Sequence, residues 1–99
     1  MSFVMTQPEP MMAAASDLQA IDSAVSAGNA AAAGPTTGVI PAAADEVSAA
    51  AAAQFSVHAQ TYQAISAQAA AIHEMFVSTL GTSAASYAVT ETTNASVVG

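Results

Sequence analysis

One stretch, residues 47–80, constrains the fold more than any other part of the chain. Its larger side chains, with alanines between them, recur in steps of three or four residues, which is the period of a stripe down one side of a long α-helix. The stripe comprises Val47, Ala51, Phe55, His58, Tyr62, Ile65, Ala69, Ile72, Phe76 and Leu80. A helix over residues 45–80 would be roughly 50 Å long at ~1.5 Å per residue. A compact domain of 99 residues cannot easily cover such a helix, so we expect other helices to lie along it.

Composition limits what the chain can bind. It contains no Lys and no Arg, and its formal net charge is −7. Without a basic patch, binding to nucleic acid is excluded. Much of the apolar fraction is alanine, with three Phe, two Tyr and no Trp. Because each alanine buries little apolar area while backbone ordering costs the same, we expect a hairpin of this composition to be unstable alone.

A first helix is predicted over about residues 8–33. Two registers fit its start: Thr6 as N-cap with Glu9 completing a capping box, or Gln7 as N-cap with Pro8 at the first helical position. Both registers put Glu9 in the first turn, at the positive end of the helix dipole. The large residues on the apolar face of this helix are Met11, Leu18, Ile21 and Val25.

A short connection is expected to join this helix to the next. Gly34 and Pro35 are predicted to end the first helix, and residues 34–44 form the connector. The second helix, about residues 45–80, begins near Pro41 or Asp45. Two long helices with a short connection form an antiparallel hairpin, so the predicted fold class is all-α. Beyond it, Gly81 is expected to bend the chain before a short helical segment at 81–91 and a flexible tail at 92–99, all within a single domain.

The search for catalytic residues finds no usable set. His73 and Glu74 suggest a zinc helix, but that motif needs a second histidine at position 77, where Val77 stands. The sequence contains no cysteine, so thiolate metal sites and disulfides are excluded. His58 lies on the apolar face and is interpreted as an interface or core histidine. We therefore predict no enzyme activity, no metal site and no cofactor.

Targeting signals are also sparse. The N-terminus has no basic region and no long apolar run, because Pro8, Glu9 and Pro10 interrupt it, so a cleavable signal peptide is not expected. The longest run of small uncharged residues, 47–57, is about half of the ~20 residues that a membrane-spanning helix needs. No membrane span is predicted.

Several motifs resemble those of the mycobacterial PE family. They are Met-Ser-Phe-Val at residues 1–4 followed by Pro8 and Glu9, the connection at 35–48, and Ala-Ala-Ile-His-Glu-Met-Phe-Val at 70–77. The resemblance covers the whole chain and is closest to short members made of the PE domain alone. Tyr87 and Glu91 also match the Tyr-x-x-x-Asp/Glu pattern of type VII secretion substrates.

The resemblance implies an obligate heterodimer with a PPE protein, in which the hairpin completes a four-helix bundle. The implied partner interface comprises Leu18, Ile21, Val25, Phe55, His58, Tyr62, Ile65, Ile72, Phe76 and Leu80. The pair would be exported by type VII machinery to the cell surface, the outer membrane or the medium. Tyr87 and Glu91 would form the secretion signal, on a segment expected to make few core contacts. After export, the implied role is support of solute passage across the outer membrane, and the alternative is a host-directed virulence effector.

Overall fold

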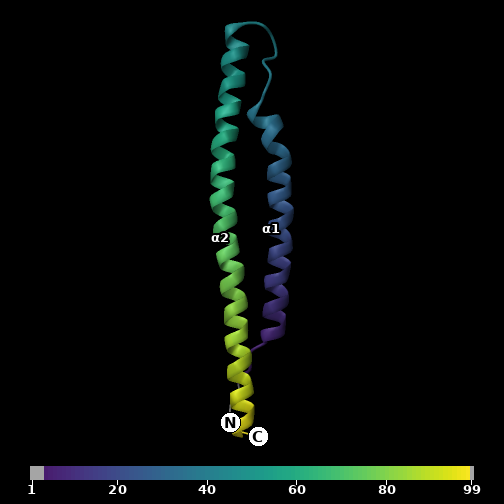
Figure 1. Ribbon diagram of the computed structural model, residues 1–99, viewed down its shortest axis with the longest axis vertical. Helices are drawn as coiled ribbons and strands as arrows, with labels where there is room; N and C mark the ends of the chain where they lie inside the picture. Colours follow the sequence, from purple (N-terminus) through teal and green to yellow (C-terminus); the bar gives the residue numbers. More distant parts are fainter. Residues whose placement is uncertain (1–3, 99) are drawn as a thin grey trace. The chain divides into compact units, whose positions relative to one another are not determined.

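The computed structural model describes residues 4–98, which form two α-helices and no strand (Figure 1). Helix α1 spans Pro8–Thr37 and helix α2 spans Glu46–Val98, with a connector at residues 38–45. The predicted all-α class is confirmed for this part of the chain. The first three residues of the family motif, and Gly99 of the predicted tail, lie outside the described residues.

The start of α1 follows the second of the two predicted registers. Pro8 is the first helical residue, and the Met11 N–H donates to the Gln7 carbonyl oxygen at 3.2 Å. Gln7 is therefore the N-cap, and Pro8 occupies the position where its missing N–H costs nothing. Glu9 lies in the first turn, as predicted. Thr6 precedes the cap and is available for another partner.

The end of α1 differs from the prediction, because the helix continues past Gly34 and Pro35 to Thr37. The proline removes one backbone hydrogen bond, but the hydroxyls of Thr36 and Thr37 each donate at 2.6 Å to the carbonyl oxygen four residues earlier. The Gly38 N–H closes the last turn by donating to the Gly34 carbonyl oxygen at 3.1 Å. The two hydroxyls thus find acceptors on their own helix, and the Gly34 carbonyl oxygen is satisfied without a left-handed cap.

Helix α2 begins at the second of its two predicted positions. Asp45 is its N-cap: one carboxylate oxygen accepts from the Ser48 N–H at 2.7 Å, and the other accepts from the Ser48 hydroxyl at 3.0 Å. The Asp45 carbonyl oxygen accepts from the Ala49 N–H at 3.0 Å. Asp45 thus satisfies backbone groups that the first helical turn leaves unpaired.

The far end of α2 corrects two expectations. The helix continues through Gly81, where a bend was predicted, and through the predicted tail to Val98. Gly81 is followed by good and moderate helix formers with no proline, so its cost of about 1 kcal/mol is insufficient to break the helix. Within the tail, hydroxyls bond back to their own helix, as Thr92 does to Ala88 and Thr93 does to Val89. This satisfies the polar side chains while the helix continues.

The chain divides into two compact units, each made of two helical segments. Unit 2, Ser23–Ile72, contains the end of α1, the connector and the start of α2. Unit 1 contains residues 4–22 and 73–98, so the start of α1 lies beside the last part of α2 (Figure 1). The buried side chains are Ala52 and Ala59 in unit 2, and Ala15 and Ala84 in unit 1. Among the described residues, only alanines are buried.

Candidate protein-interaction surface

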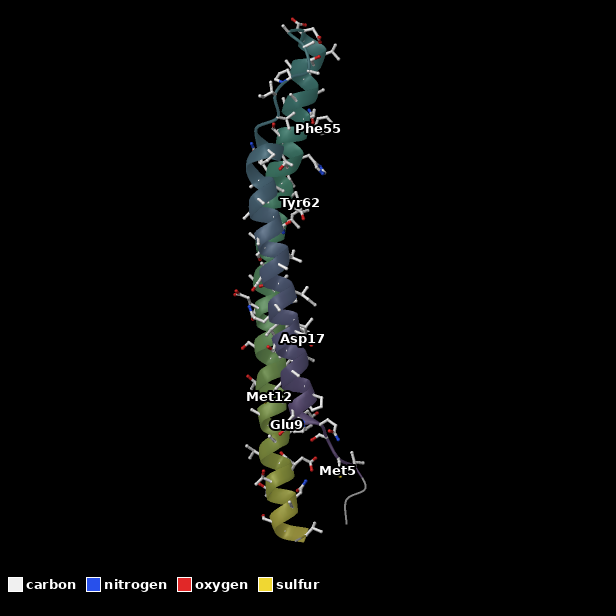
Figure 2. The ribbon with its side chains drawn as sticks, turned by 90° about the vertical axis from the view of Figure 1, so that its right-hand side faces the viewer. Met5, Glu9, Met12, Asp17, Phe55 and Tyr62 are labelled. Atoms are coloured by element: carbon white, nitrogen blue, oxygen red, sulfur yellow. The ribbon has the colours of Figure 1, made fainter. Side chains whose placement is uncertain are left out.

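In unit 2, the large side chains of the predicted stripe are exposed, although the Tyr62 hydroxyl reaches across to α1. Phe55 is 65% exposed, and Tyr62 is 50% exposed. Figure 2 shows both side chains extending from the ribbon of α2. The remaining exposed members of the predicted interface in this unit are Val25, His58, Ile65 and Ile72.

A second set of residues, most of them with small side chains, lines the seam of unit 2. Along α2, half-buried Ser56, Gln63, Ser66 and Ala70 alternate with the buried alanines at steps of three and four. This seam lies beside the stripe of large residues on the same helix. Because small side chains let the two helices approach closely, they fill the seam and leave the large ones outside.

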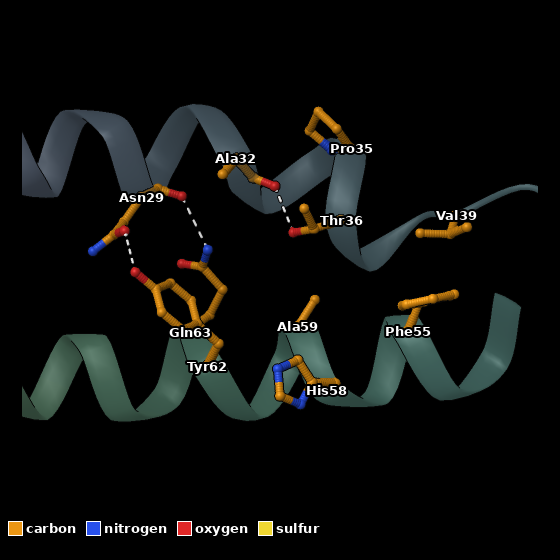
Figure 3. A pocket seen from close by; sticks show the side chains of 10 residues that line it. All are labelled: Asn29, Ala32, Pro35, Thr36, Val39, Phe55, His58, Ala59, Tyr62 and Gln63. Atoms are coloured by element: carbon orange, nitrogen blue, oxygen red, sulfur yellow. Dashed lines mark hydrogen bonds between the residues drawn. The ribbon is translucent and has the colours of Figure 1, made fainter. Parts of the chain in front are cut away.

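A groove of about 400 Å³ opens beside the seam in unit 2. Figure 3 shows the Val39 side chain of the connector facing the ring of Phe55, with His58 and Tyr62 further along α2. The remaining lining residues are Asn29, Ala32, Pro35, Thr36, Ala59 and Gln63. This part of the stripe therefore lines an apolar groove whose walls include aromatic side chains.

Asn29 of α1 lines this groove and accepts two hydrogen bonds from side chains of α2. The Tyr62 hydroxyl donates to Asn29 Oδ1 at 2.8 Å, and Gln63 Nε2 donates to the Asn29 carbonyl oxygen at 3.0 Å (Figure 3). These bonds fix the relative position of α1 and α2 within unit 2. Neither bond can be predicted from the sequence, because bonds between residues more than thirty positions apart leave no local pattern.

In unit 1, the residues of the predicted interface divide into two groups. Ile21 and Phe76 are exposed, at 55% and 56%. Leu18 and Leu80 are half-buried and therefore contribute to the seam as well as to the surface. His73 also lies in this seam, where Nε2 is 2.8 Å from the Leu18 carbonyl oxygen. Since a carbonyl only accepts, Nε2 carries the proton in this bond.

The predicted secretion signal lies in the packed part of unit 1, which corrects the expectation that residues 81–91 make few core contacts. Ala84 is 0% exposed. Glu91 is half-buried, and its Oε1 accepts from the Thr6 N–H at 3.1 Å and from the Thr6 hydroxyl at 3.0 Å. Tyr87, one helical turn earlier, is 45% exposed. One residue of the pair thus faces outward and the other is held by the N-terminal segment.

Within residues 4–98, no three His, Cys, Asp or Glu side chains gather where they could hold a metal ion. Over the same residues, neither helix has a segment that is long and apolar enough to cross a membrane.

The chain matches the PE family over residues 4–94. It is 62% identical over 95 residues to PE family protein PE13 of Mycobacterium tuberculosis, which covers 96% of each chain. It is also 62% identical over 93 residues to PE-PGRS family protein PE_PGRS11 of that organism, covering 94% of this chain and 16% of the relative. PE family protein PE8 is 55% identical over 96 residues, covering 97% of this chain and 35% of the relative.

The chain therefore belongs to the PE family. It spans nearly all of PE13 but a minor part of the longer relatives, in which the same domain accompanies other sequence. The family motif residues Pro8 and Glu9 form the first turn of α1, where Pro8 is half-buried and Glu9 is exposed.

Proposed function

We propose that this PE protein is a non-enzymatic interaction protein that forms an obligate heterodimer with a PPE protein. Family membership implies a partner of the PPE kind. In the proposed complex, two partner helices lie along the exposed stripe in each unit and complete a four-helix bundle. The observation that carries this proposal is the contrast between a core of alanines and a surface that exposes the chain's large apolar side chains.

The energetics favour such a cover. Full burial of a Phe, Ile or Val side chain contributes about 1.5–3 kcal/mol. At several positions of the stripe the large side chain is exposed, so this stabilisation is not gained. Among residues 4–98, the seam buries only alanines, and each of these contributes little. Partner helices that bury the exposed groups supply the missing stabilisation. The outward-facing members available to them are Ile21, Val25, Phe55, Tyr62, Ile65, Ile72 and Phe76.

The groove in unit 2 supports the choice of partner. Its walls are apolar and aromatic, and its volume of about 400 Å³ suits a few large side chains of another helix. Interface energy concentrates where aromatic residues pack into pockets of this kind. The His58 ring adds polar atoms to the lining that can hydrogen-bond to the partner, whereas the Tyr62 hydroxyl already donates to Asn29.

The proposal extends to export. Tyr87 and Glu91 carry the Tyr-x-x-x-Glu pattern, and their spacing places them on neighbouring positions of one helical face. We assign them as the signal read by a type VII secretion apparatus. The heterodimer would then reach the cell surface, the outer membrane or the medium. After export, the proposed role is support of solute passage across the outer membrane.

Truncation of one stripe residue in each unit tests the heterodimer. In complexes co-purified with the PPE partner, Phe55→Ala and Phe76→Ala should each weaken association by about 2–4 kcal/mol, because a buried aromatic is lost. Val57→Ala is the matched control, since Val57 is 57% exposed but lies on another face of α2. Binding would be measured by isothermal titration or by competition. Equal effects of the Phe and Val substitutions would contradict the assigned face.

A further inference from the structure

The contact between Thr6 and Glu91 joins positions 85 residues apart within unit 1. Both Thr6 donors, the N–H and the hydroxyl, converge on one atom, Glu91 Oε1. Two hydrogen bonds, one from the Thr6 backbone and one from its side chain, define the direction of a carboxylate more tightly than a single bond does. Thr6 is itself half-buried, so the contact is part of the packing of this unit.

Thr6 has few competitors for the Glu91 carboxylate. The sequence contains no Lys or Arg, so no such cation of the chain can pair with it. In the first turn of α1, Pro8 and Pro10 have no N–H, and the Met11 N–H is bonded to Gln7. The hydroxyls next to Glu91 in sequence, those of Thr90 and Thr92, donate to carbonyls of α2. The N-terminal segment therefore supplies the donors.

We propose that Thr6 is a positioning residue of the export signal. It holds the Glu91 carboxylate in a fixed orientation one helical turn from Tyr87, so that a receptor meets the ring and the carboxylate in one arrangement. The signal is then composite, built from the segment before α1 and the last part of α2. This inference rests on the proposed export function of Tyr87 and Glu91.

The hydrogen bonds can first be tested directly in the co-purified complex. The Thr6 amide resonance should shift in Glu91→Ala, because the acceptor of its N–H is removed. It should stay in place in Glu74→Ala, which removes an exposed carboxylate from the same helix of the same unit. An unchanged Thr6 resonance in Glu91→Ala would show that the contact is absent in solution and would overturn the inference.

Export is then measured in a mycobacterial strain that secretes the wild-type pair. Thr6→Val keeps the shape and the backbone N–H but removes the hydroxyl, and export should fall on the order of tenfold, the factor expected for loss of one hydrogen bond to a charged group. Thr6→Ser keeps both donors and should export normally. Thr79→Val, at an exposed position of the same unit, is the matched control and should also export normally. All variants should assemble with the partner inside the cell.

Tyr87→Ala and Glu91→Ala separate this inference from the function on which it rests. If both block export while Thr6→Val is secreted normally or in excess, Thr6 has no positioning role and only the inference is overturned. If Thr6→Val loses the complex inside the cell, Thr6 acts in folding, and the inference is again wrong. If Tyr87→Ala and Glu91→Ala are both secreted normally, the proposed signal itself is contradicted.

Discussion

At the residue scale, polar contacts decide the alignment of the helices in each unit. In unit 2, Asn29 receives one bond from Tyr62 and one from Gln63. In unit 1, Glu91 receives two bonds from Thr6. An alanine-rich seam has few features of shape that select one register between two helices. These directional hydrogen bonds are therefore the main means by which each unit specifies the register of its helices.

Gln63 provides a test of this alignment. Gln63→Glu replaces the donor Nε2 with an acceptor facing the Asn29 carbonyl oxygen, so the complex should be destabilised by about 1–3 kcal/mol. Gln60→Glu makes the same chemical change at an exposed position of α2 and should be near neutral. Chemical denaturation of the two complexes measures the difference. Equal stability would show that the Gln63 bond contributes nothing.

Asp45 predicts a dependence of stability on pH. Hydrogen bonds from the Ser48 backbone N–H, and then from its hydroxyl, lower the pKa of Asp45 below its ordinary value of 3.8. Because the folded pKa is the lower one, this stabilisation is present above the unfolded pKa and is lost as pH falls through the folded pKa. Asp45→Asn should lower the melting temperature near neutral pH, and its difference from wild type should shrink as pH is lowered from about 5 through the folded pKa of Asp45.

The control for this titration is Asp17→Asn, an exposed position within α1. Its difference from wild type should be small at each pH, because Asp17 caps no helix. A melting difference for Asp45→Asn that stays constant across the acid range would contradict the assignment of a charged cap.

At the scale of the elements, the sequence predicts the helices well and their ends poorly. The hydrophobic period identifies both helices, and the start of α2 lies at one of the two positions that the sequence left open. Pro35 and Gly81 mislead, because each is a breaker by intrinsic preference but lies where the helix continues. Beyond Pro35, the hydroxyls of Thr36 and Thr37 bond back to carbonyls of the preceding turn, so these polar side chains are satisfied while the helix continues.

Gly81 tests the continuity of α2. A Cβ added at this position meets no atom within 4 Å beyond its own helical surroundings. Gly81→Ala should therefore stabilise the complex by about 0.5–1 kcal/mol, through the lower backbone entropy of alanine in the unfolded chain. At Gly38, after the end of α1, the added Cβ would be 3.3 Å from the Gly34 carbonyl oxygen, so Gly38→Ala should give no such gain. Destabilisation by Gly81→Ala in thermal unfolding would indicate a bend at this residue.

At the scale of the whole molecule, the sequence predicts an apolar stripe that must pack against other helices. It does not distinguish the stripe from the residues that form the seam between α1 and α2. Phe55 and Phe76 carry a strong hydrophobic signal and prove to be exposed. Ser56 and Gln63 carry almost none, yet they line the seam. The stripe and the seam repeat with the same period on adjacent faces of α2. Only the structure therefore separates the surface left for a partner from the surface that packs against α1. The contact between Thr6 and Glu91 has no periodic signal at all.

The most direct test of the need for a partner is the behaviour of the chain purified on its own. Sedimentation velocity combined with thermal unfolding followed by circular dichroism measures both its association state and its cooperativity. Because only alanines are buried among residues 4–98, we predict unfolded, self-associated or aggregated material without a sharp transition, and rescue by co-expression with the PPE partner. A monodisperse monomer that melts in one sharp cooperative transition would contradict this account.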